Sequence, residues 1–82
     1  MFLFKKKGLI EYRLEIHGMK CGMCESHIND VIRKNFDVKK VKSDRFKNQT
    51  IILSNVALDE EKIKSVIAET GYELKEIRKE EY

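Results

Sequence analysis

Apolar and polar residues alternate over residues 9–16 of the chain. The apolar positions are Ile10, Tyr12, Leu14 and Ile16. A period of two residues is that of a β-strand, and apolar residues on a single side predict a strand with one buried face. Gly18 ends the alternation and opens a segment that contains both cysteines of the chain.

The spacing of apolar residues changes after this segment. Over residues 22–35, one stripe is made by Cys24, Ile28, Val31, Ile32 and Asn35. These positions recur every three or four residues, which predicts an α-helix with one buried side. The predicted helix therefore begins at or inside the segment that holds the cysteines.

Two more strands are expected in the middle of the chain. Residues 38–44 predict one strand, and residues 50–54, which are rich in β-branched side chains, predict the next. The four residues between them, 45–48, are expected to form the turn. The two strands are close enough in sequence to pair as a hairpin.

A second helix and a last strand complete the pattern. Asp59 is a good N-cap residue, so a helix is expected to follow it and to end at Thr70, with Gly71 just beyond the last turn. The inner face of this helix is predicted to carry Ile63, Val66, Ile67 and Thr70. Residues 72–77 predict the last strand, and the charged residues after it are expected to fray.

The order β-α-β-β-α-β predicts an α+β fold of the ferredoxin-like type. In this fold a four-stranded antiparallel sheet carries two helices on one face. A chain of 82 residues forms one domain with a modest core. The expected boundaries are a flexible leader over residues 1–8, the folded domain over residues 9–78 and a charged tail over residues 79–82.

The charge is mildly basic, with 17 Lys and Arg against 14 Asp and Glu, for a net charge of +3. This is not the strong excess of a nucleic-acid-binding protein, so no nucleic-acid partner is expected. Basic residues cluster at Lys5, Lys6 and Lys7 and again at Lys39, Lys40, Lys42, Arg45 and Lys47. Such clusters have two interpretations, a solvated face or a docking surface for an acidic partner.

The amino terminus predicts a cytoplasmic protein without membrane insertion. Its apolar part, residues 1–4, is followed at once by three lysines, and it is too short for a secretory signal or a membrane span. A reducing cytoplasm would keep the two thiols free. The two cysteines are also too close in sequence for a disulfide that staples a fold.

The residues best suited to bind a metal ion lie in one segment, His17-Gly18-Met19-Lys20-Cys21-Gly22-Met23-Cys24, which contains both cysteines. Thiolates are soft ligands that prefer Cu(I), Zn(II), Cd(II) or Hg(II). A Cys-x-x-Cys (CxxC) motif lets both sulfurs face one ion, and Gly22 allows the turn between them to be tight. Cys24 is expected in the first turn of the helix, where free N–H groups and the helix dipole lower a thiol pKa.

The number of donors favours copper. Two sulfurs suit Cu(I), which accepts two ligands, whereas structural Zn(II) takes four. His27 lies three residues after Cys24 and is either a third ligand or a surface histidine. Two other hypotheses stay open at this point: a Zn(II), Cd(II) or Hg(II) binding protein that also uses His27, and a thiol–disulfide redox protein.

The pattern Gly18-Met19-x-Cys21-x-x-Cys24, between a strand and a helix, resembles the heavy-metal-associated domain family. The resemblance extends over residues 9–77. The family includes small soluble copper chaperones and the amino-terminal domains of copper-transporting P-type ATPases. The resemblance implies that Cys21 and Cys24 bind the metal and that Met19 is buried and supports the loop. It also implies that Tyr72 packs near the metal, as in bacterial members.

The same resemblance implies a role and a partner. The expected role is that of a metallochaperone, which passes its ion to the metal-binding domain of a copper-transporting P-type ATPase, and a metal-bridged homodimer is a further expectation. Lys20 and Glu25 depart from the family pattern, which commonly has Thr or Ser and a small apolar residue there. No arrangement of side chains typical of catalysis is evident, so an enzyme is not expected.

Overall fold

The alternating segment near the start of the chain forms the strand β1, Ile10–His17. The computed structural model describes residues 9–81. The elements that follow β1 are α1 (Gly22–Asn35), β2 (Lys40–Asp44), β3 (Gln49–Ser54), α2 (Glu60–Thr70) and β4 (Glu73–Glu81). The predicted order of strands and helices is therefore confirmed.

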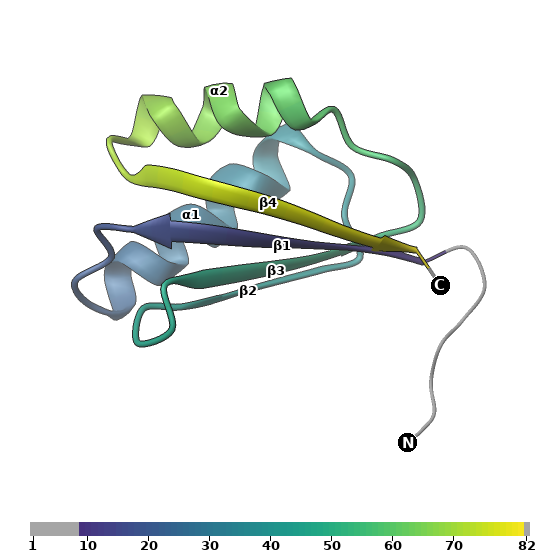
Figure 1. Cartoon of the computed structure of the whole chain (residues 1–82). Helices are drawn as coiled ribbons and strands as arrows, with labels where there is room; N and C mark the ends of the chain where they lie inside the picture. Colours follow the sequence, from purple (N-terminus) through teal and green to yellow (C-terminus); the bar gives the residue numbers. More distant parts are fainter. Residues whose placement is uncertain (1–8, 82) are drawn as a thin grey trace, which may run out of the picture.

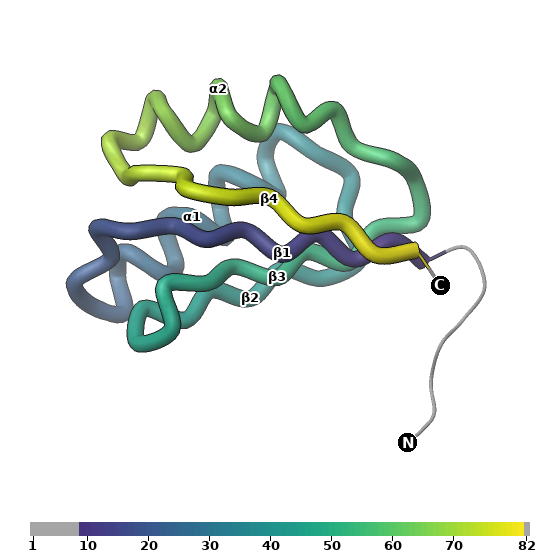
Figure 2. Tube along the Cα trace, in the orientation of Figure 1, coloured from purple at the N-terminus to yellow at the C-terminus, as the bar shows by residue number. Residues whose placement is uncertain are grey.

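The four strands form one antiparallel sheet in the order β2-β3-β1-β4. Strand β1 lies inside the sheet, whereas β2 and β4 form its two edges. Both helices cover the same face (Figure 1), and the tube in Figure 2 shows β1 and β4 running side by side. This is the predicted ferredoxin-like fold, and no helix within residues 9–81 covers the second face of the sheet.

The core lies between the sheet and the two helices. Strand β1 contributes Tyr12, Leu14 and Ile16, the helices contribute Ile28, Ile32, Ile63, Val66 and Ile67, and Met19, Val41 and Ile52 complete the cluster. The hydroxyl of buried Tyr12 accepts a hydrogen bond from the Leu58 N–H (2.9 Å). Its polar end is therefore paired, as a buried hydroxyl requires.

The two helices begin in different ways. Asp59 caps α2, because its carboxylate accepts hydrogen bonds from the N–H groups of Glu61 (3.0 Å) and Lys62 (3.4 Å). Gly71 ends α2 in the left-handed region at φ 90°, as the sequence predicted. The N-cap of α1 is Cys21, whose side chain makes no capping bond. No side chain therefore caps the first N–H groups of α1 at the CxxC motif, and the N–H of Cys24 donates to the Cys21 carbonyl (3.1 Å).

The prediction that the chain frays after residue 77 was wrong for the residues the structure describes. Strand β4 continues to Glu81 and pairs with β1 as far as Ile10. Backbone hydrogen bonds of an antiparallel ladder do not depend on apolar side chains, so a charged segment can extend the strand. The predicted leader, residues 1–8, and Tyr82 lie outside the described residues.

None of the described helices is long and apolar enough to cross a membrane. The longer of the two, α1, has 14 residues.

Candidate metal site

Three connections meet at one end of the sheet: the β1–α1 loop, the β2–β3 turn and the α2–β4 loop (Figure 1). Gly18 is in the left-handed region at φ 106°, and a Cβ placed on it would lie 3.4 Å from Cδ1 of Tyr72. Glycine therefore allows the first loop to adopt this backbone and to approach the α2–β4 loop closely. The CxxC motif and Tyr72 are brought together in this way.

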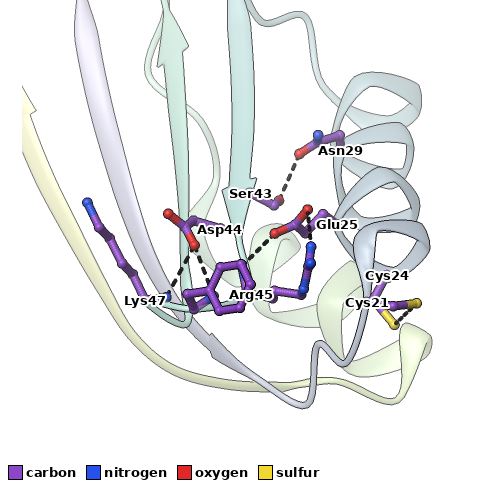
Figure 3. A network of polar contacts seen from close by, with 9 residues as sticks. Cys21, Cys24, Glu25, Asn29, Ser43, Asp44, Arg45 and Lys47 are labelled. Atoms are coloured by element: carbon purple, nitrogen blue, oxygen red, sulfur yellow. Dashed lines mark hydrogen bonds and ion pairs between the residues drawn. The ribbon is translucent and has the colours of Figure 1, made fainter.

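Cys21 and Cys24 place their sulfurs 4.0 Å apart at the start of α1 (Figure 3). Both thiols are free, and Cys21 is exposed whereas Cys24 is half-buried. With metal–sulfur bonds of about 2.3 Å, two sulfurs at this separation can bind one ion with an angle of about 120° at the ion. The spacing suits a shared metal ion without a change in the backbone.

The pKa of Cys24 is lowered from 9.0 to about 7. The largest cause is a hydrogen bond from the backbone of Lys20, followed by hydrogen bonds from the Tyr72 hydroxyl and the backbone of Cys21. The same contact raises the pKa of Tyr72 to about 12, because its hydroxyl donates to Cys24 and the neighbouring sulfurs disfavour a second negative charge. Cys24 is thus in large part a thiolate at neutral pH, the form that binds metal.

The two methionines near the sulfurs have opposite surroundings. Met19 is buried and belongs to the core cluster, so it packs beneath the loop. Met23, between the cysteines, is 81% exposed. Met19 is buried, as the resemblance implied, its role in supporting the loop stays a prediction, and the Met23 side chain faces solvent.

His27 lies beside Tyr72, with the ring centroids 5.8 Å apart in an edge-on arrangement. Among residues 9–81, no group of three His, Cys, Asp or Glu side chains is placed to hold a metal ion. The role of His27 as a third ligand therefore stays a prediction. His17 is hydrogen-bonded to Glu15 (2.7 Å), on its own strand.

An ion pair between Glu25 and Arg45 is the feature of this site that the sequence did not reveal. The Glu25 carboxylate accepts hydrogen bonds from the backbone N–H of Arg45 (2.7 Å) and from its Nη1 (3.1 Å), as Figure 3 shows. The two residues are 20 positions apart. The pair fastens the first turn of α1 to the β2–β3 turn, and it neutralises the charge that Glu25 brings next to Cys24.

A family model supports the assignment that this geometry suggests. The model of the heavy-metal-associated domain matches residues 13–73, which include both cysteines and Tyr72. No curated protein matches the sequence.

Two solved structures share the fold. The N-terminal domain of ZntA in its Zn(II) form has a TM-score of 0.72 and 18% sequence identity, covering 80% of this chain and 89% of that chain. The apo form of the same domain has a TM-score of 0.71 and 18% identity, covering 89% of this chain and 94% of that chain. The family model spans most of the chain, and the chain therefore belongs to the heavy-metal-associated domain family, whose members are metal-binding modules.

Proposed function

We propose that this domain binds one Cu(I) ion through Cys21 and Cys24 and passes it to a partner protein. The observation that carries the proposal is the pair of free thiols, 4.0 Å apart at the start of α1. The lowered pKa of Cys24 supplies a thiolate near neutral pH. The free-energy cost of removing the thiol proton when the metal binds is therefore small.

The number and type of donors support Cu(I). Thiolates are soft ligands, and Cu(I) accepts two of them, whereas Zn(II) in structural sites takes four ligands. Within residues 9–81, the sulfurs of Cys21 and Cys24 lie 4.0 Å apart, and no group of three or more His, Cys, Asp or Glu side chains is placed to hold a metal ion. A Zn(II), Cd(II) or Hg(II) ion would draw on His27 or on donors from a second protein.

Exposure of the sulfurs supports transfer. Cys21 is exposed and Cys24 is half-buried, so a thiolate of another protein can reach an ion held between them. Exchange then proceeds through three-coordinate intermediates, in which each step replaces one sulfur. Family membership makes a metal-binding domain of a copper-transporting P-type ATPase the proposed partner, in the cytoplasm, with a metal-bridged homodimer as a second assembly.

An anaerobic titration with Cu(I) in the presence of a competing chelator tests this proposal. The wild-type domain is expected to bind one equivalent, and Cys21→Ser and Cys24→Ser are expected to lose this binding. The matched control is His27→Ala, which is expected to keep its Cu(I) affinity because two sulfurs suffice. Unchanged binding in both serine variants would refute the proposal.

A further inference from the structure

The side chain of Arg45, in the β2–β3 turn, lies against the CxxC motif. Its Nη1 is 3.8 Å from the position that a Cβ would take on Gly22, between the two cysteines. The same nitrogen donates a hydrogen bond to Oε1 of Glu25 (3.1 Å), the residue that follows Cys24 (Figure 3). The guanidinium therefore approaches the motif at its middle and directly after its second cysteine.

Several contacts fix the position of this guanidinium. The Glu25 carboxylate also accepts a hydrogen bond from the backbone N–H of Arg45 (2.7 Å), so the two residues are joined at two points. The guanidinium carbon lies 4.4 Å from the centre of the Phe46 ring, within the range of a cation–π contact. The Asp44 carboxylate accepts hydrogen bonds from the N–H groups of Phe46 (2.9 Å) and Lys47 (3.3 Å) and so fixes the turn.

The ion pair is also partly shielded from water. The side chains of Arg45 and Glu25 are 31% and 21% exposed. In the pair of Arg33 and Asp30 on α1, the two side chains are 58% and 75% exposed. Solvent and salt screen an exposed pair strongly, so the buried pair is expected to contribute more to a fixed geometry.

The first turn of α1 has few other contacts that hold it in place. Its N-cap residue, Cys21, makes no side-chain capping bond. The N–H groups of Cys24 and Glu25 donate to the Cys21 carbonyl over 3.1 and 3.4 Å. An uncapped first turn is the part of a helix that opens most readily. Because Glu25 lies in this turn, its pair with Arg45 connects the turn to the sheet.

We propose that Arg45, acting through Glu25, is a positioning residue that holds the two cysteines in place and so slows the loss of the ion. This inference rests on the proposed function. Residues that orient metal ligands without binding the ion commonly change metal affinity by about 10–100-fold. The resemblance to the family does not imply this pair, because a small apolar residue is common at the position of Glu25.

The rate at which the loaded domain releases Cu(I) to excess bicinchoninate, without oxygen, tests the proposal. Arg45→Ala and Glu25→Ala are each expected to release the ion about tenfold faster than the wild type. The double variant is expected to be no faster than either single variant, because all three lose the same contact. Additive effects in the double variant would overturn the positioning role.

The signs of the two single effects separate positioning from a simple effect of charge. Arg45→Ala makes the surroundings of the sulfurs more negative, whereas Glu25→Ala makes them more positive. An effect of charge alone would therefore speed release in one variant and slow it in the other. Opposite changes would overturn the positioning role, and equal acceleration in both variants supports it.

Two control variants separate positioning from loss of stability. Ile52→Ala removes a fully buried core side chain that does not contact the sulfurs, and it is expected to release Cu(I) at the wild-type rate. Arg33→Ala removes an exposed ion pair of α1 and is also expected to keep this rate. Acceleration in Ile52→Ala equal to that in Arg45→Ala would overturn the positioning role.

Hydrogen exchange in the metal-free protein gives a measurement that does not depend on copper. The amide protons of Cys24 and Glu25 are expected to exchange about tenfold faster in Arg45→Ala than in Arg33→Ala, because the first turn of α1 opens more often. Equal exchange in these two variants, or equal rates of Cu(I) release, would overturn the positioning role and leave the proposed function standing. A wild-type chain that fails to take up Cu(I) overturns both.

Discussion

Cys24 differs from an ordinary surface cysteine in the groups that surround its sulfur. The backbone of Lys20, the Tyr72 hydroxyl and the backbone of Cys21 all lower its pKa, which falls from 9.0 to about 7. Folding therefore favours the thiolate. In the metal-free protein, this contribution to stability is complete above a pH of about 9 and is lost as the pH falls through about 7. Protons compete with the metal over the same range.

Removal of the Tyr72 hydroxyl tests this view of Cys24. In Tyr72→Phe the pKa of Cys24 is expected to rise, because the thiolate loses one hydrogen-bond donor while the bond from the Lys20 backbone remains. The ultraviolet absorbance of the thiolate, followed against pH in the metal-free protein, measures the change. Cys24→Ser identifies which titration step belongs to this residue. An unchanged midpoint in Tyr72→Phe would contradict the assigned hydrogen bond.

At the scale of elements, local patterns predicted most of what the structure contains. The helix predicted over residues 22–35 has those bounds, because its stripe and the glycine before it are both local signals. The cysteines and Tyr72 were singled out from motif and family, and the structure places Tyr72 against Cys24. The length of β4 was not predictable, because Arg78 to Glu81 carry no apolar alternation and pair through their backbone.

The ion pair of Glu25 and Arg45 could not be predicted for a different reason. It joins a helix to a turn 20 residues away, and no local pattern encodes such a pairing. Sequence reasoning therefore treated Glu25 as a charge near the metal and Arg45 as one of a basic cluster. Only the folded sheet brings the β2–β3 turn beside the first turn of α1.

Truncation of Glu25 tests the importance of this link. The Glu25 side chain is 21% exposed and accepts two hydrogen bonds, so Glu25→Ala is expected to lower the free energy of unfolding by about 1–3 kcal/mol. Urea denaturation of the metal-free protein measures this. The control is Glu61→Ala, whose side chain is 83% exposed in its pair with Lys64, with an expected loss below about 0.5 kcal/mol. Equal losses would show that the link contributes nothing beyond a surface pair.

At the scale of the whole molecule, the position of β2 at one edge of the sheet explains part of the basic cluster. The side chains of Lys40 and Lys42 are exposed on the edge strand β2. Lysines on an edge strand oppose pairing with other chains, so this part of the basic cluster has a structural explanation. A docking surface for an acidic partner, the alternative interpretation of the cluster, is not required by the fold.

Two neighbouring isoleucines of β3 form a matched pair, one fully buried and one half-buried. Ile52 in β3 is fully buried against the helices, whereas its neighbour Ile51 is half-buried. Ile52→Ala is expected to cost about 2–5 kcal/mol of unfolding free energy and Ile51→Ala clearly less, as measured by urea denaturation. Cu(I) affinity in native buffer is expected to be unchanged in both, because neither residue contacts the sulfurs. A loss at Ile51 equal to that at Ile52 would contradict the assignment of the core to one face.

X-ray absorption at the copper edge of the Cu(I)-loaded domain tests the central claim most directly, because it counts and identifies the atoms bound to the ion. With one equivalent of Cu(I) at low protein concentration, the result expected is two sulfur neighbours and no nitrogen, and the same spectrum in His27→Ala. A third neighbour that disappears in His27→Ala, or a spectrum that is unaltered in Cys21→Ser and Cys24→Ser, would contradict a two-sulfur site.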